Sequence, residues 1–150
     1  MSRCSGPNRP GRGSGSSALC TGSARGGRRL FSVVARAIIL RDSTEMIGHI
    51  RFHTRPDPEY LHSYARGAIE LGYVVFVAYR KQGYAHEALL GAISRAEEGY
   101  SIKHFVASIS PRNLPSINLI AKLGFRKVGQ HVDEIDGIEH VYLRDVIRIP

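Results

Sequence analysis

The chain has 150 residues, 43% of them hydrophobic, and a formal net charge of +8. This length predicts one domain with a core that needs no disulfides or metals, and the longest apolar run, 71–79, is too short to span a membrane.

The excess positive charge is confined to the N-terminal part of the chain. Positions 1–41 hold eight arginines and no acidic residue, and the other 13 basic residues balance the 13 acidic ones. A dedicated nucleic-acid domain is therefore disfavoured, and only the N-terminal part is expected to attract nucleic acid, non-specifically.

Residues 1–29 consist mostly of Gly, Ser, Arg and Pro and show no hydrophobic periodicity. Such a composition cannot bury enough apolar surface to offset chain entropy, so we expect a disordered basic tail at 1–29 and a folded domain at 30–150. An organelle transit peptide and a misplaced start site are alternatives. Both cysteines, Cys4 and Cys20, lie in this tail and form neither a disulfide framework nor a zinc site, which favours a reducing, cytoplasmic location.

Strands are expected first in the folded part. β-Branched and aliphatic residues predict strands at 33–40 and 46–53, joined as a hairpin. A nearly all-apolar run predicts a central strand at 68–78, covered on both faces. Gly72 inside that run indicates a bulge or a close approach of the backbone to another group.

Helices alternate with the later strands. Apolar residues at helical spacing predict a helix from 83 to 98, ended by Gly99. A second helix is expected between Asn113, a good N-cap, and Gly124. Further strands are expected at 103–110, 125–132 and 140–147. This order predicts an α/β fold with a mixed, mostly antiparallel sheet and crossover helices.

The segment between the central strand and the first helix has the features of an anion site. The first turn of a helix leaves backbone N–H groups unpaired, and the helix dipole favours a negative charge there. Gly83 lets a ligand approach the backbone, Ala85 keeps the floor small, and Arg80 and Lys81 add positive charge. These features suit a pyrophosphate, although the segment is neither a dinucleotide-binding fingerprint nor a P-loop. An ordinary strand–turn–helix connection is the alternative.

Two motifs resemble those of the GNAT acetyltransferases. Arg80-x-x-Gly83-x-Ala85 is similar to their Q/R-x-x-G-x-G/A motif, and Asn113-x-x-Ser116 followed by 122–125 (Lys-Leu-Gly-Phe) is similar to the branch that includes ribosomal-protein N-terminal acetyltransferases. The resemblance implies a GNAT-like acyl-CoA N-acyltransferase fold with acetyl-CoA as co-substrate. The coenzyme-binding residues that it implies are Val75, Phe76, Val77, Arg80, Lys81, Gln82, Gly83, Tyr84, Ala85, Asn113 and Ser116.

The chain departs from this family in two respects. Members normally begin with a strand and one or two helices that form part of the acceptor site, and here the tail takes that place, so an N-terminally truncated domain is expected. Many members also carry a tyrosine as general acid on the helix after Asn113, where this chain has Ile120. Either Ser116 takes over as catalytic acid, or the acid is lost or replaced by water.

Glu70 is the candidate general base, because partial burial beside a bulge suits a carboxylate to accept a proton. A solvated strand residue is the alternative. His53 is expected as a surface histidine on the acceptor side, and Tyr73 and Tyr84 are expected to be packing residues. The histidines lack metal-ligand spacing, so no metal site is expected.

Two functions are compatible with these observations. The first is an acetyl-CoA-dependent N-acetyltransferase, in which a primary amine of a protein N-terminus or a small molecule attacks the thioester directly in a ternary complex. The second is an acetyl-CoA-binding or catalytically impaired module whose basic tail binds polyanions. We expect a weak enzyme, because the acceptor-site elements are not found in 1–29, unless a homodimer partner supplies the missing wall. No membrane partner is expected.

Overall fold

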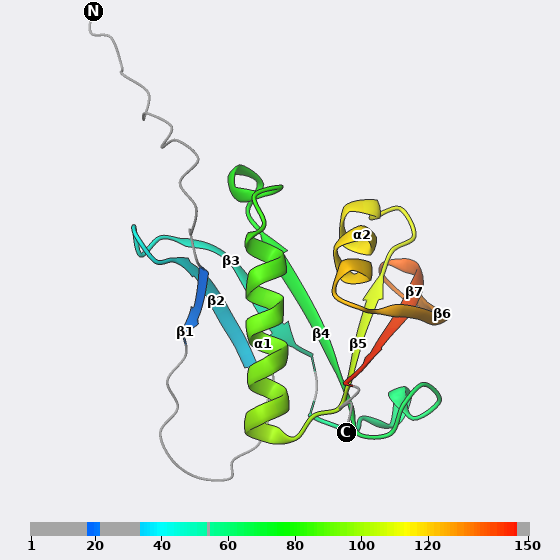
Figure 1. Cartoon of the computed structure of the whole chain (residues 1–150). Coiled ribbons are helices and arrows are strands. Elements are labelled where there is room, and N and C mark those ends of the chain that lie inside the picture. The colour runs from blue at the N-terminus through cyan, green and yellow to red at the C-terminus, as the bar shows by residue number, and fades with distance from the viewer. Residues whose placement is uncertain (1–17, 22–33, 54, 147–150) are drawn as a thin grey trace, which may run out of the picture.

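The computed structural model describes residues 18–21, 34–53 and 55–146. One mixed sheet with the strand order β1-β2-β3-β4-β5-β7-β6 carries two helices (Figure 1), which confirms the expected α/β fold. The strands are β1 Ala18–Thr21, β2 Val34–Leu40, β3 Met46–Phe52, β4 Ala68–Val75, β5 His104–Ile109, β6 Arg126–Asp133 and β7 Gly137–Asp145. The helices are α1 Tyr84–Tyr100 and α2 Leu114–Lys122, with short 3-10 turns η1 Glu59–Leu61 and η2 Val77–Tyr79.

The sheet divides between β4 and β5, its one parallel pair in the described part of the chain. Residues 68–70 pair with 104–106, and the two strands then part, although β4 continues to Val75 and β5 to Ile109. Figure 1 shows the resulting V, with the N-terminal ends of α1 and α2 at its open end. The sheet therefore has a gap at its centre that none of the described strands fills.

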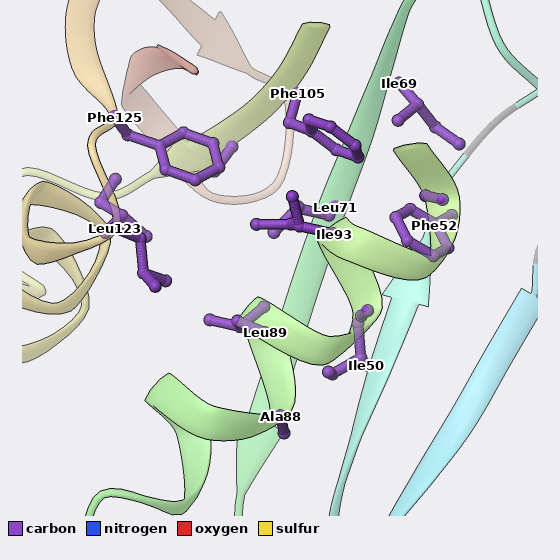
Figure 2. Close-up of a cluster of buried hydrophobic side chains, with 14 of the residues drawn as sticks. Ile50, Phe52, Ile69, Leu71, Ala88, Leu89, Ile93, Phe105, Leu123 and Phe125 are labelled. Atoms are coloured by element: carbon purple, nitrogen blue, oxygen red, sulfur yellow. The ribbon is translucent and has the colours of Figure 1, made fainter. Parts of the chain in front are cut away.

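The main core lies between the helices and one face of the sheet. The apolar stripe of α1 has the expected helical spacing and consists of Ala88, Leu89, Ala92, Ile93 and Ala96. In Figure 2, Leu89 and Ile93 lie among side chains of the sheet such as Ile50 and Leu71. Ile120 of α2 belongs to the same core. Both helices thus cover one face, and burying each such large side chain contributes roughly 1.5–3 kcal/mol.

The opposite face of the sheet carries a smaller cluster. Its members are Leu61, Ala68, Val106, Val141 and Leu143. Tyr64, in the loop that follows η1, packs against this cluster. Because side chains alternate along a strand, the residues of β4 that share this face with Ala68 are Glu70, Gly72 and Val74.

Two expectations about individual elements need correction, and the structure decides between the two alternatives for Gly72. Helix α1 continues through Gly99 and ends at Tyr100, because Ser101 takes a left-handed conformation with φ of 57°. The central strand ends at Val75 instead of 78, because η2 follows. Gly72 lies at no bulge, since its pairing with β3 continues in register. A Cβ at Gly72 would lie 2.5 Å from Nε2 of His53, so the close approach explains this glycine.

The expectation of a disordered tail is wrong for Ala18–Thr21, which forms strand β1 and pairs antiparallel with β2 at the edge of the sheet. A strand therefore precedes the hairpin, while the expected lack of the helices that normally follow it stays a prediction. Four residues give too short a pattern to be recognised without the neighbouring strand that supplies their hydrogen bonds. The rest of 1–29 lies outside the described residues, so its disorder stays a prediction. No helix in the described ranges is long and apolar enough to cross a membrane.

Candidate active site

A cleft of about 380 Å³ opens where β4 and β5 part, a size within the range of small-ligand sites. Tyr73 and Ser116 line it on the side of the helices. Gly72, Ser108 and Glu139 line it on the other side, as the alternation along β4, β5 and β7 requires. The cleft therefore reaches both faces of the sheet.

Beyond Glu70, strand β4 turns toward this cleft a backbone edge that pairs with no strand in the described residues. The N–H of Phe76 donates to the carbonyl of Ile47 on the β3 side over 2.8 Å. Since backbone groups of successive residues point to opposite edges of a strand, those of Tyr73 and Val75 point to the side where β5 has moved away. Such an edge suits an extended ligand that pairs as a strand would.

The coenzyme contacts predicted for Val75, Phe76 and Val77 agree only in part with this geometry. Phe76 has its N–H committed to Ile47, and Val77 begins the turn η2, so neither offers a strand edge to a ligand. Val75 keeps its edge position, but its carbonyl accepts a 2.9 Å hydrogen bond from Nε of Arg80. Arg80 therefore holds the loop onto the end of β4, in addition to supplying charge.

The N-terminus of α1 has the geometry expected of an anion site. Gly83 adopts a φ of 88°, and no side chain caps the helix there. Lys81 also has a positive φ, 59°, and the side chain of Gln82 donates to the carbonyl of Ala78 over 3.1 Å. The first-turn N–H groups of 84–86 have no carbonyl partner within the helix. The dipole of α1 adds positive potential at this end.

The N-terminus of α2 lies on the far side of the cleft. Oδ1 of Asn113 accepts a 3.2 Å hydrogen bond from the N–H of Ser116, which confirms the predicted cap, and Gly124 follows the helix with a φ of 83°. Ile120 is fully buried in the core, so its place on the helix offers no group to the cleft. Ser116 does line the cleft.

Glu70 lies at the apex of the V and is the last residue of β4 that pairs with β5. It is 8% exposed, so the solvated alternative is wrong. Tyr60 donates its hydroxyl to Oε2, and Ser108 donates its hydroxyl to Oε1 over 2.6 Å. Both carboxylate oxygens are thus already held, and Glu70 reaches the cleft through Ser108.

A second carboxylate, Glu139 on β7, lines the cleft and was not singled out from the sequence. Burial raises the pKa of Glu139; His131 opposes the rise over 3.4 Å, and Asp133, Asp136 and Glu70 add to it. The sequence offers one signal for it, the alternation of Glu139 with apolar residues of β7, but only the position of β7 beside β5 brings it to the cleft.

Within the described ranges, no three His, Cys, Asp or Glu side chains are grouped to hold a metal.

Tyr73 was expected to be a packing residue, and the structure gives its hydroxyl a more exceptional environment. The oxygen is buried and has no hydrogen-bond partner in the described part of the chain. Burial raises the pKa of Tyr73 above 10.0, and the neighbouring Ser116 side chain opposes this shift without reaching hydrogen-bond geometry. Tyr73 and Ser116 thus bring two hydroxyls together at the wall of the cleft.

Comparison with known proteins agrees with this architecture. Residues 19–126 match the family model described as acetyltransferase (GNAT) domain. The chain is 32% identical over 94 residues to the uncharacterized N-acetyltransferase YnaD of Bacillus subtilis, and the match covers 61% of this chain and 49% of the relative. The chain therefore spans about half the length of that relative.

Two solved structures share the fold. The ribosomal-protein-S5-alanine acetyltransferase from Vibrio fischeri has a TM-score of 0.64 at 18% identity, over 75% of this chain and 61% of that one. RimL, a ribosomal L7/L12 alpha-N-protein acetyltransferase in complex with coenzyme A, has a TM-score of 0.60 at 18% identity, over 75% and 62%. Identities this low establish the fold alone. With the family model matching most of its length, this chain belongs to the GNAT acetyltransferase family.

Proposed function

We propose that this domain transfers the acetyl group of acetyl-CoA to a primary amine. The observation that carries the proposal is the gap between β4 and β5, because the cleft there reaches both faces of the sheet. One face offers two helix N-termini to an anionic coenzyme. The other offers carboxylates to a cationic amine. Donor and acceptor can therefore meet in one opening from opposite sides.

The coenzyme side is proposed as follows. The N-terminus of α1, with residues 80–85, holds the pyrophosphate through backbone N–H groups and the helix dipole. The pantetheine arm then pairs with the free edge of β4 at Tyr73 and Val75, which also polarises the thioester carbonyl. Asn113 and Ser116 close the opposite wall. The coenzyme complex of the structurally similar RimL supports this use of the fold.

On the acceptor side, the two carboxylates receive different roles. Glu70 is held by Tyr60 and Ser108 and acts as a fixed negative charge that attracts an ammonium group. Glu139 has a raised pKa and takes the ammonium proton, because a base with a pKa nearer neutrality accepts a proton more readily. The freed amine attacks the thioester carbon directly within the ternary complex, where proximity replaces a bimolecular encounter.

Acetyl transfer by the purified protein tests the proposal. The protein is mixed with acetyl-CoA and a panel of primary amines, among them peptides with free N-termini and polyamines, and free thiol and the mass of the acceptor are followed. We expect thiol release that depends on the amine, together with addition of one acetyl group. The same peptides with a blocked N-terminus are the control. Binding of acetyl-CoA without transfer would favour the alternative of a binding module.

Three further expectations belong to the same proposal: a cytoplasmic location, weak activity of the chain on its own, and a homodimer that completes the acceptor wall. Turnover measured against oligomeric state, with light scattering on the same samples, tests the last two. Robust turnover by a monomer, on the order of 1 per second or faster, would remove the need for a partner.

A further inference from the structure

We propose that the acceptor of this domain is a free α-amino acid with an apolar side chain, an inference that deepens the proposed acetyl transfer and rests on it. The observation that carries it is the distribution of charged side chains around the cleft. Arg51 and His53 line the cleft from β3 and its end, and Asp136 and Glu139 line it from the β6–β7 hairpin. Since β3 and β7 lie on opposite sides of the gap in the strand order, one wall carries basic side chains and the other carries acidic ones.

The charged side chains of β3 and β7 share the face of the sheet that is opposite the helices. Arg51 pairs with Gly72, and residues that pair across antiparallel strands lie on one face. Glu139 shares its face with Val141, which belongs to the smaller cluster on that side. The coenzyme pyrophosphate is proposed to lie at the N-terminus of α1, a helix that covers the other face. The anion that Arg51 is placed to bind therefore belongs to the acceptor.

Arg51 is suited to hold a carboxylate. Its guanidinium is always charged and can donate parallel hydrogen bonds to both carboxylate oxygens. Arg51 is exposed, and no Asp or Glu of the described ranges forms an ion pair with it. The ring of His53 lies over Gly72, the partner of Arg51, since a Cβ there would be 2.5 Å from Nε2 of His53. Gly72 thus leaves the space in which the ring of His53 reaches the cleft.

The acidic wall can hold the ammonium group of the same molecule. Glu139 is the proposed base, and Asp136 is exposed in the turn that joins β6 to β7. A free amino acid carries its ammonium and carboxylate groups on one carbon atom and so offers a partner to both walls. A peptide N-terminus or a polyamine has no carboxylate beside its amine, and an amine with further positive charges would be repelled by Arg51. The two walls therefore favour a zwitterion.

A second cavity, of about 230 Å³, indicates what side chain this amino acid carries. It adjoins the cleft, because Ser108 lines both. Tyr60, Leu61, Tyr64 and Val141 supply most of the rest of its lining, which includes no Lys, Arg, Asp or Glu of the described residues. An apolar side chain gains free energy on leaving water for such a cavity, whereas a charged one would be desolvated there without a partner.

The chemical step is balanced without any further reactant. The ammonium group gives one proton to Glu139, and the freed nitrogen forms a bond to the thioester carbon. The C–S bond breaks with its electron pair going to sulfur, and a second nitrogen proton ends on that sulfur. The products are the N-acetyl amino acid and the thiol of coenzyme A. Arg51 and His53 hold the carboxylate and exchange no proton in this step.

Acetylation of L-leucine, L-leucinamide and isoamylamine by the purified protein tests the proposal. The three amines share a side chain, and the two comparators bracket leucine in amine basicity, so a preference for leucine reports on its carboxylate. We expect kcat/KM for leucine to exceed the other two on the order of 10- to 100-fold, as for a hydrogen bond between charged groups. L-Aspartate should be a poorer acceptor than leucine, because the second cavity offers its side chain no cation.

Arg51→Gln tests the role of the guanidinium. The ratio of kcat/KM for leucine over leucinamide should fall on the order of 10-fold or more, while the Kd for acetyl-CoA stays unchanged. Arg95→Gln is the matched control, because Arg95 is exposed on α1 and lines neither cavity, and it should keep the ratio of the wild type. Calorimetry with leucine in the presence of coenzyme A measures acceptor binding without transfer.

The outcomes separate this inference from the proposed function. Equal kcat/KM for the three amines, a preference that survives Arg51→Gln, or a preference for peptides, polyamines or aspartate would overturn the inference and leave acetyl transfer in place. Binding of leucine that depends on Arg51, without transfer to any amine, would support the acceptor site and reject the proposed function. Neither binding nor transfer would reject both.

Discussion

Replacing Gly83 by Glu places a negative charge at the N-terminus of α1, where the pyrophosphate is proposed to bind. A carboxylate about 4 Å from a phosphate oxygen repels it by about 1 kcal/mol in bulk water and by about 4 kcal/mol near a protein surface. Gly83 is exposed, so the lower part of that range applies. Since 1.4 kcal/mol is a factor of ten, a loss of about 1–3 kcal/mol weakens acetyl-CoA binding roughly 5- to 140-fold.

Two controls separate repulsion from backbone strain. With a φ of 88° at Gly83, any side chain there is strained by about 1–2 kcal/mol, although a Cβ would meet nothing within 4 Å. Gly83→Ala carries this strain without the charge and should bind acetyl-CoA nearly as the wild type does. Gly124→Glu carries both at a similar φ of 83°, away from the cleft. Calorimetry at low and high salt should show a loss only in Gly83→Glu, smaller at high salt. Equal affinity in all four proteins would refute the assignment.

Two further predictions concern stability. Asn113→Ala removes the cap on the N–H of Ser116 and should lower the free energy of unfolding by about 1 kcal/mol, measured with denaturant; no change would mean that water replaces the cap. Burial opposes ionisation of Asp145, but hydrogen bonds from Arg126 and His104 outweigh it and lower the pKa of that carboxyl below 3.8. The stabilisation of the folded state by ionised Asp145 is therefore present above about pH 3.8, and it is lost as the pH falls through the lower pKa of the folded protein. Asp145→Asn should show a shallower loss of stability between about pH 5 and about pH 2, and an unchanged slope would contradict this reasoning.

The parts of the fold that depend on residues close together in the sequence could be predicted. The apolar side chains of α1 recur at helical spacing. Asn113 caps helix α2, whose first turn directly follows it. Strand β1 could not be predicted, because its four residues gain hydrogen bonds only from β2. The end of α1 also differs from the prediction. Glycine is the usual residue after a helix, so Gly99 was expected to end it, but here Ser101 takes the left-handed conformation.

The candidate site divides in the same way. The proposed anion site before α1 is a local motif, and its backbone geometry is as expected around Gly83. Glu139 reaches the cleft only because β7 lies between β5 and β6, an order that no local pattern specifies. Alternation places Tyr73 on the helix face, but the burial of its hydroxyl without a partner among the described residues depends on three-dimensional packing. The environments of Glu139 and Tyr73 at the cleft therefore depend on contacts between residues far apart in the sequence.

The pairing of 68–70 with 104–106 is the shortest strand pairing of the described sheet. Amide hydrogens of Tyr73 and Val75, which point into the V, have no strand partner to slow their exchange with deuterium in the free protein. A coenzyme arm seated along that edge would protect them and brace the two half-sheets at a fixed opening. The carboxylates would then face an amine across a gap of defined width. If the proposed acetyl transfer holds, this geometry would favour binding of the donor before the acceptor.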